Sequence, residues 1–152
     1  MFIGDIMIVY ENGKRIVSRA VTFIDDKVLL IERFRKENNE MLHYFTIPGG
    51  GVEEGESYED AAIRETREET CCNIEISKTL EIEDYGSGIC HWFYAKYISG
   101  TPELGGEEKE RNNPNNSFKV VLINMNDIDN INILGAGKKI VKECYKLYKN
   151  KK

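Results

Sequence analysis

The segment from Gly50 to Cys72 constrains this chain more than any other part, because its acidic residues recur at the spacing of a helix. Glu65, Glu68 and Glu69 fall at positions i, i+3 and i+4, so a helix places their three carboxylates on one face. Two carboxylates about 6 Å apart repel each other by roughly 3 kcal/mol at an effective dielectric constant of about 20. A hard divalent cation such as Mg²⁺, which takes oxygen ligands, relieves such a face.

The same region carries signals for the start of that helix and for the element before it. Ser57 followed by Asp60 resembles a capping box, so we predict a helix over residues 58–70. A strand is predicted over residues 43–47, where Pro48 and the three glycines after it end the ladder and permit tight backbone geometry. A strand and a helix are therefore joined here by a glycine-rich connection.

The remainder of the chain alternates between strand patterns and one more helix pattern. Strands are predicted over residues 2–10, 16–24, 28–33, 74–84, 89–97 and 118–125, with turns at 25–26 and 86–88. Residues 33–41 are expected to form a solvated loop or a strand extension, residues 100–116 a long polar loop, and residues 138–149 a helix.

Composition limits the class of protein. With 152 residues, 41% hydrophobic and 31% charged, the chain is expected to form one globular domain spanning residues 1–152. The net charge of −5 argues against general binding to nucleic acids or anionic membranes. It does not exclude a nucleotide, because a bound metal ion reverses the local field.

Location and redox state are also predicted from the sequence. No basic start precedes an apolar run, and no apolar stretch approaches ~18 residues, so we expect neither a signal peptide nor a membrane span. The cysteines lack a paired C-x-x-C spacing, which favours reduced thiols and a cytoplasmic location. The four are Cys71, Cys72, Cys90 and Cys144.

The acid-rich segment also fits a known pattern, G-x5-E-x7-R-E-U-x-E-E-x-G-U, at every charged position. The matching residues are Gly50, Glu56, Arg64, Glu65, Glu68 and Glu69. This is the signature of the Nudix (MutT-like) hydrolases, and the chain resembles that family on this ground. The lead-in FTIPGGGVEEGE and the earlier stretch SRAVTFIDDKVLLIERFR resemble family members as well.

Three positions depart from the signature. Thr66 replaces an aliphatic residue, Cys71 replaces the last glycine, and Cys72 stands at the final aliphatic position. A glycine at position 71 would end the helix in the left-handed conformation, where a Cβ atom costs about 1 kcal/mol. Asn73, two positions later, is the alternative left-handed residue.

The resemblance implies a Nudix-type α/β/α sandwich with a mixed sheet, the helices over 58–70 and 138–149 covering opposite faces. It implies hydrolysis of a diphosphate linkage in a nucleoside diphosphate linked to another moiety, with Mg²⁺, or Mn²⁺ as a substitute, as cofactor. Oxidised or ordinary nucleoside triphosphates come first among the expected substrates, and family members are often homodimers.

The resemblance also implies roles for individual residues of this chain. The implied metal ligands are Glu56, Glu65, Glu68, Glu69 and the carbonyl group of Gly49 or Gly50, and Arg64 is expected to orient the carboxylates, with Glu68 or Glu65 as its partner. The base that activates water is either Glu65 or a loop acid, with Glu110 ranked first and Glu108 second. Arg19 and Arg33 are candidates for phosphate contacts, and Tyr44 for stacking on a base.

Two other functions stay open at this point. One is a non-catalytic nucleotide-binding sensor or regulatory domain on the same fold, which the loss of signature acids would favour, although none is lost here. The other is an isomerase on a related scaffold, which would need a catalytic group outside the signature, such as Cys90.

Overall fold

The structure is a computed structural model that describes residues 2–3, 6–7 and 9–151. Its strands are β1 (Phe2–Ile3), β2 (Ile6–Met7), β3 (Tyr10–Glu11), β4 (Lys14–Ile24), β5 (Lys27–Glu37), β6 (Glu40–Thr46), β7 (Gly49–Gly51), β8 (Asn73–Asp84), β9 (Gly88–Ser99) and β10 (Asn116–Asn124). Its helices are α1 (Tyr58–Thr70), α2 (Gly106–Arg111), the 3-10 helix η1 (Met125–Asn130) and α3 (Gly137–Lys149).

The main sheet is mixed, as predicted. Its path runs β10, β5, β4, β9, β8, with β3 and β7 also pairing with β4 and β6 pairing with β5. Strands β4 and β9 run parallel, whereas β5 pairs antiparallel with β4, β6 and β10. The β structure predicted over residues 2–10 is present as short strands: β1 pairs with β2 and β3 pairs with β4, while residues 4, 5 and 8 lie outside the described part.

Strands β4 and β5 separate soon after the turn that joins them, and this separation makes room for the glycine strand. They pair only through Phe23 with Val28 and Ile24 with Lys27. Nearer its N-terminus, β4 pairs with β7 instead, in a register that sets Arg19 opposite Gly49. The glycine-rich connection predicted from the sequence therefore runs against the middle of the sheet.

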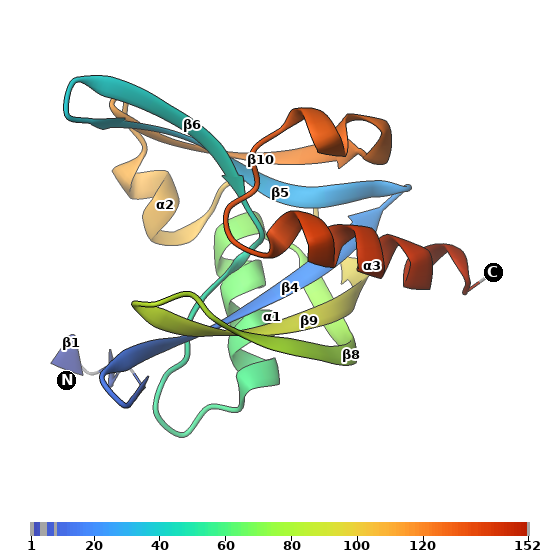
Figure 1. The fold of residues 1–152 in the computed structure, drawn as a ribbon, viewed down its shortest axis with the longest axis horizontal. Coiled ribbons are helices and arrows are strands. Elements are labelled where there is room, and N and C mark those ends of the chain that lie inside the picture. The colour runs from blue at the N-terminus through green and yellow to red at the C-terminus, as the bar shows by residue number, and fades with distance from the viewer. Residues whose placement is uncertain (1, 4–5, 8, 152) are drawn as a thin grey trace.

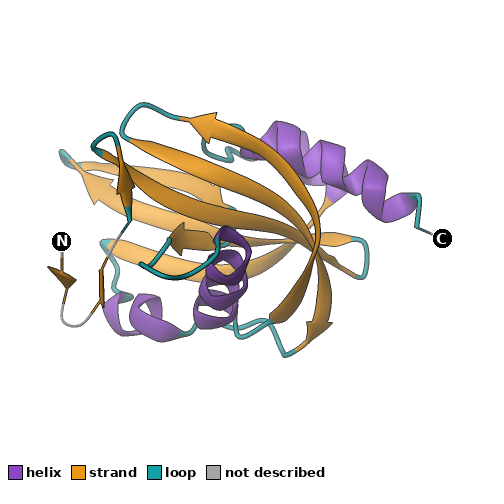
Figure 2. Cartoon of the chain, turned by 90° about the horizontal axis from the view of Figure 1, so that it is seen from below, coloured by secondary structure: helices purple, strands orange, loops and turns teal. Residues whose placement is uncertain are grey.

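Two helices cover opposite faces of this sheet, which confirms the predicted α/β/α sandwich (Figures 1 and 2). The α1 face buries Ala62 against Ala20 and Phe93. On the other face, the buried side chains of α3 pack against alternate residues of β4, because side chains along a strand point to opposite faces in turn. That cluster includes Val17, Val21, Trp92, Ile140, Val141 and Cys144.

The N-terminal end of α1 is capped as the sequence predicts, whereas its C-terminal end is formed by a residue that departs from the family signature. Ser57 caps the first turn, its Oγ accepting from the amide of Asp60 at 3.0 Å, as predicted. Cys71 itself takes the left-handed conformation (φ 62°, ψ 17°), and its amide donates to the carbonyl of Arg67 at 2.9 Å. The alternative that Asn73 is the left-handed residue is wrong, because Asn73 begins β8 and has no positive φ.

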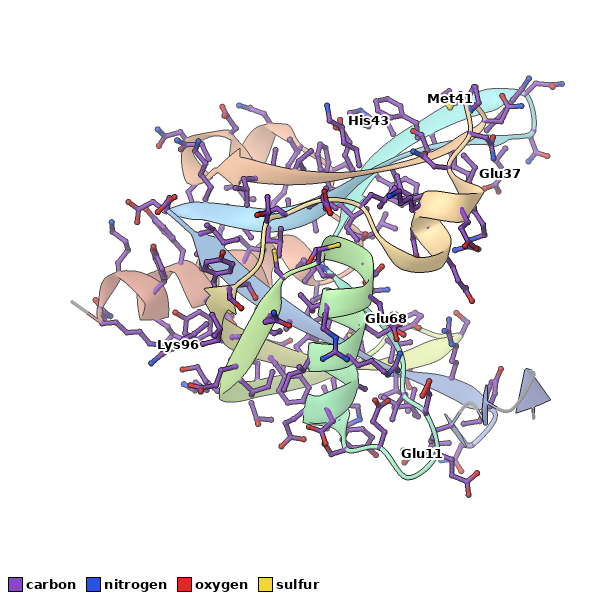
Figure 3. All side chains as sticks on the ribbon, turned by 180° about the vertical axis from the view of Figure 1, so that it is seen from behind. Glu11, Glu37, Met41, His43, Glu68 and Lys96 are labelled. Carbon is purple, nitrogen blue, oxygen red and sulfur yellow. The ribbon has the colours of Figure 1, made fainter. Side chains whose placement is uncertain are left out.

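Of the two long connections, residues 33–41 form the strand extension that was one of the two predicted alternatives, and residues 100–116 are more regular than predicted. Residues 33–41 continue β5 and β6 into a projecting hairpin, with Glu37 paired with Glu40 and a turn of two residues with positive φ, Asn38 and Asn39. Figure 3 shows Glu37 and Met41 near its tip. The loop predicted over 100–116 contains α2, a six-residue helix that the sequence analysis missed.

In the part of the chain that the structure describes, no helix is long and apolar enough to cross a membrane.

Candidate active site

Arg64 lies at the centre of a hydrogen-bond network that joins α1, β7 and the loop between them. Its Nε donates to Oε2 of Glu56 at 2.7 Å, and its Nη2 donates to Oε1 of Glu56 and to the carbonyl of Gly51, both at 3.0 Å. Its Nη1 donates to Glu65 at 3.0 Å and to Glu68 at 3.2 Å. The partners predicted from helix spacing are therefore present. The bidentate partner is Glu56, which lies in the loop before the helix and which helix spacing alone does not reveal.

These contacts explain the charge states of the pair. The hydrogen bond to Glu56 raises the pKa of Arg64, so its guanidinium stays charged. Burial works to raise the pKa of Glu56, but the hydrogen bonds from Arg64 and from the amide of Glu53 outweigh it and hold that pKa below its ordinary value. The loop is thereby fixed to the helix by a charged, two-point contact.

Glu69 is the most buried acid of the signature. Only 8% of its surface is exposed, and its Oε1 accepts from the amide of Gly49 at 2.8 Å. Burial raises the pKa of Glu69 to about 8, against the opposing effects of that hydrogen bond and of the charge on Arg19. The nearby charges of Glu65 and Glu108 raise it further. Burial is therefore the main reason that this carboxyl group resists ionisation.

Glu65 lies one turn earlier on α1, directly against β7. A Cβ atom on Gly50 would stand 2.5 Å from its carboxyl carbon, so a side chain at position 50 would force the carboxylate of Glu65 to move. Burial raises the pKa of Glu65, which Arg64 partly opposes, and Glu68 and Glu108 raise it further. Glu68 is more open, with 49% of its side chain exposed, and lies on the flank of α1 (Figure 3).

A loop closes over the C-terminal end of α1 and brings in one further acid. The amides of Glu103 and Gly105 donate to the carbonyls of Thr70 and Glu69, which sets α2 beside α1. Glu108 of α2 is partly buried, and its charge acts on both Glu65 and Glu69. The first-ranked loop acid, Glu110, is exposed, as are Glu103 and Glu107. The structure thus sets Glu108, the second-ranked residue, nearest the carboxylate cluster.

The donor set fits a hard divalent cation in its chemistry. Its side-chain groups are carboxylates on one helix face, and two of them carry a raised pKa because burial and like charges disfavour ionisation. Among the described residues, however, no three acid, histidine or cysteine side chains converge as a metal-binding group in this conformation. Arg64 occupies the space between Glu56, Glu65 and Glu68, so these acids would have to turn from it to bind an ion together.

Arg19 links the acidic cluster to a neighbouring cavity. Its Nη1 donates to the carbonyl of Ile47 at 2.6 Å, while its charge acts on Glu69. The cavity has a volume of about 240 Å³ and lies on the α3 side of the sheet. It is lined by Arg19, Thr46, Ile47, Glu83, Tyr85, Cys90, Trp92, Leu134 and Gly135. Sequence reasoning named Arg19 but not the cavity, whose walls come from segments far apart in the chain.

The other two predicted substrate residues, Arg33 and Tyr44, lie between β5, β6 and β10, where the charge of Glu108 acts on Arg33. Arg33 pairs with Tyr44 across the strands, and its guanidinium carbon lies 3.8 Å from the ring centre of Phe118. It also donates to Asn116 and to the carbonyl of Ser117. Tyr44 is 8% exposed and does not line the cavity beside Arg19. The structure brings Arg19, but not Tyr44, to the acidic cluster.

The family model for the NUDIX domain matches residues 14–142 of this chain. The chain belongs to the Nudix family. Among its relatives, a protein of Methanocaldococcus jannaschii named ADP-ribose pyrophosphatase is 35% identical over 92 residues, which cover 57% of this chain and 53% of that protein. An uncharacterised Nudix hydrolase of Bacillus subtilis, YvcI, is 44% identical over 54 residues, which cover 36% of this chain and 30% of that protein.

Solved Nudix structures share the fold over a greater length. A NUDIX hydrolase from Nitrosomonas europaea superposes with a TM-score of 0.65 at 19% identity, covering 88% of this chain and 89% of that one. An ADP-ribose pyrophosphatase from Streptococcus suis gives a TM-score of 0.61 at 17% identity, covering 90% and 93%. At these identities the likeness concerns the fold. The chain spans about half or less of the length of the matched curated relatives.

Proposed function

We propose that this Nudix chain is a Mg²⁺-dependent pyrophosphohydrolase that cleaves the diphosphate linkage of a nucleoside diphosphate joined to another moiety. The observation that carries the proposal is the buried carboxylate of Glu69, which has a pKa raised to about 8 beside two further acids of the same helix. A carboxylate kept in such surroundings without a paired side-chain cation is suited to bind a metal ion.

The chain's own residues would prepare the site for such an ion. Glu65, Glu68 and Glu69 would hold it, with Glu56 and a carbonyl of the glycine strand as further oxygens. A bound Mg²⁺ supplies neutralisation of the charge that develops on the phosphate oxygens and activation of water. Arg64 is a positioning residue, since its contacts with Glu56 and Gly51 hold the loop, helix and strand in one arrangement.

Glu108 is proposed as the residue that accepts the proton of the attacking water. Glu65, the other candidate, accepts a hydrogen bond from Arg64 at 3.0 Å, and the charge of Arg64 opposes the protonation that a general base undergoes. The nearest cation to Glu108 is Arg111, at 3.5 Å. Glu108 thus takes the role that the sequence assigned first to Glu110.

The nucleoside part of the substrate is proposed to occupy the 240 Å³ cavity beside Arg19. Arg19 lines this cavity and its charge acts on Glu69, so it is the proposed contact for a phosphate of the substrate. Glu83 forms part of the wall, its carboxylate accepting from the indole of Trp92 at 3.1 Å and from the amide of Ala136 at 3.2 Å. Its remaining lone pairs can accept from an amino group of a base.

ADP-ribose is the first substrate to test, ahead of the nucleoside triphosphates that the sequence ranked first. A relative 35% identical to this chain is named an ADP-ribose pyrophosphatase, as is one of the proteins that share its fold. ADP-ribose has the nucleoside diphosphate that the proposed reaction requires. The cytoplasmic location and a homodimer remain predictions of the sequence analysis.

The test is a turnover assay in Mg²⁺ with ADP-ribose and the nucleoside triphosphates, in which mononucleotide formation is followed by chromatography. We expect release of a nucleoside monophosphate from at least one substrate, and its loss in the Glu69→Gln variant. Tight nucleotide binding without turnover on any of them would instead support the non-catalytic sensor.

A further inference from the structure

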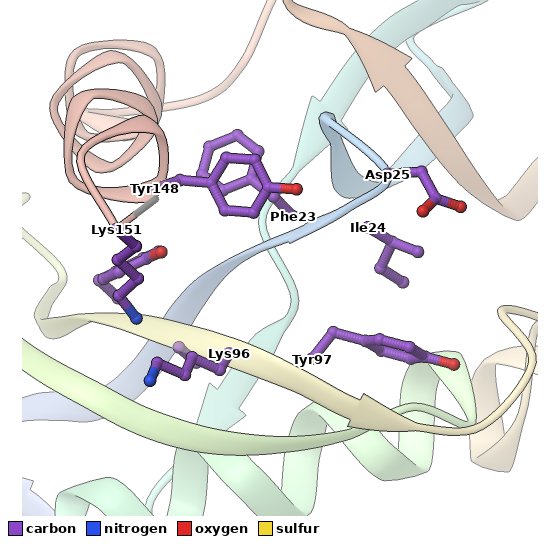
Figure 4. A pocket seen from close by; sticks show the side chains of 9 residues that line it. Phe23, Ile24, Asp25, Lys96, Tyr97, Tyr148 and Lys151 are labelled. Atoms are coloured by element: carbon purple, nitrogen blue, oxygen red, sulfur yellow. The ribbon is translucent and has the colours of Figure 1, made fainter.

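A second and larger cavity lies on the same sheet, away from the acidic cluster. Its volume is about 500 Å³, it is open to solvent on one side, and it is lined by the end of β4, by β9 and by the C-terminal end of α3 (Figure 4). Phe23 of β4 pairs with Lys96 of β9 at this cavity, four residues beyond the pair formed by Arg19 and Trp92. At about 3.3 Å per residue, the cavity begins roughly 13 Å along β4 from Arg19.

One end of this cavity gathers positive charge. Figure 4 shows the side chains of Lys96 and Lys151 extending to the same end. Lys151 also lies 4.9 Å from the ring centre of Tyr94 and donates to Oγ of Ser77 at 3.2 Å. Both lysines are exposed, and burial and then the neighbouring Lys96 lower the pKa of Lys151.

This pair of lysines has no carboxylate in direct contact. Among residues 2–3, 6–7 and 9–151, neither Lys96 nor Lys151 forms a salt bridge. The opposing charge that acts on Lys151 is that of Glu75, which is the cross-strand partner of Lys96. Two adjacent ammonium groups without a bridging carboxylate suit a ligand with two negative charges, such as a phosphate monoester.

The middle of the cavity is aromatic and apolar. The rings of Phe23 and Tyr148 lie with their centres 4.9 Å apart, with Phe23 only 4% exposed, and Tyr97, 36% exposed, lies toward the Asp25 end of the cavity (Figure 4). Such surfaces accept a flat ring by stacking. Asp25 stands at the end opposite the lysines (Figure 4), where its carboxylate can accept from a hydroxyl or amino group.

We propose that this cavity binds a nucleoside monophosphate, with the phosphate between Lys96 and Lys151 and the base against Tyr97 and the Phe23–Tyr148 pair. The order of charge, ring and acceptor along the cavity matches the order of phosphate, nucleoside and exocyclic donor in that ligand. The proposal rests on the cavity alone and is independent of catalysis at the acidic cluster.

The test is a titration of the ¹⁵N-labelled protein with AMP, followed by NMR. Saturable changes in chemical shift are expected at the amides of Ile24 and Ala95. Binding at the acidic cluster would instead change the chemical shifts of Gly49 and Gly50. The double variant K96Q/K151Q should weaken the affinity reported by Ile24 and Ala95 at least tenfold. The matched control K36Q/K119Q, with the same change of charge at exposed lysines, should leave it unchanged.

A second variant separates the ring contact from the charge contact. Tyr97→Ala should weaken AMP binding but leave the weaker binding of inorganic phosphate as it was. Absence of shifts at Ile24 and Ala95, equal effects of the two lysine pairs, or equal affinity for AMP and inorganic phosphate would each overturn the proposal. A failure of turnover at the acidic cluster would not, because these reporters lie on a different part of the sheet.

Discussion

The amide of Gly49 donates to Oε1 of Glu69 at 2.8 Å, and this hydrogen bond joins the glycine strand to the buried end of the acidic helix. The two residues are 20 positions apart in the chain. Gly49 is in turn paired with Arg19 of β4, whose charge also acts on Glu69. The position of the central acid is therefore set by the sheet as much as by its own helix.

Replacing Glu69 should separate catalysis from stability. We expect Glu69→Gln to lower turnover by at least about 100-fold, since charge stabilisation in the transition state is lost. The fold should persist, because the glutamine carbonyl can still accept from Gly49 and no buried charge remains. Measurements of kcat and of the melting temperature check both parts. Glu143→Gln, on the exposed side of α3, is the matched control. An unchanged kcat at saturating Mg²⁺ would refute the role of Glu69.

Stability of the metal-free protein should depend on pH through the same residue. Glu69 has a pKa of about 8 when folded against an ordinary 4.5, so between these values the folded protein holds a proton that the unfolded chain has lost. Its contribution to stability is therefore full below about pH 4.5 and is lost as the pH rises through about 8. Thermal unfolding in EDTA should show this decline, reduced in Glu69→Gln.

Added Mg²⁺ gives a further check on that linkage. Because a metal ion favours the ionised carboxylate, it should raise the melting temperature more at pH 8 than at pH 6. The same pH dependence in Glu69→Gln as in the unmodified protein would show that another group is responsible.

Substituting Glu108 and Glu110 separately ranks these two loop acids as candidate bases. Glu108→Gln should lower kcat by about 100-fold, in the range found for general bases, because its charge lies beside Glu65 and Glu69. Glu110→Gln should leave kcat close to that of the unmodified protein, since Glu110 is exposed. Steady-state kinetics under identical Mg²⁺ conditions decide between them. A larger loss in Glu110→Gln would restore the order predicted from the sequence.

The helix exit predicts a stabilising substitution. Cys71 holds φ at 62°, where its Cβ atom is strained. Cys71→Gly removes this strain but increases the conformational entropy of the unfolded chain, so the net rise in the free energy of unfolding should be about 0.5–1 kcal/mol. Denaturant unfolding measures the change. Cys72→Gly is the contrasting variant, and it should destabilise, because Cys72 is fully buried and lacks a positive φ. Destabilisation by both variants would contradict the strain argument.

Much of the fold could be predicted because its signals are local. Ser57 with Asp60 sets the start of α1, paired turn residues such as Asp25 and Asp26 set the hairpins, and alternation sets the strand faces. The six-residue α2 was missed because a segment rich in glycine, charge and asparagine has no apolar period to reveal it. Its position comes from contacts with α1 and β10.

The sequence by itself determined the chemistry of the site: the acids of one helix face lie together because the helix repeat puts them there, and the glycines before them permit a close approach. Only the tertiary structure decided how these groups are used. It paired Arg64 with Glu56 across a loop, buried Glu69 against Gly49, and set Glu108 rather than Glu110 beside them. Burial and distance depend on which distant segments meet, and residue spacing along one chain does not record that.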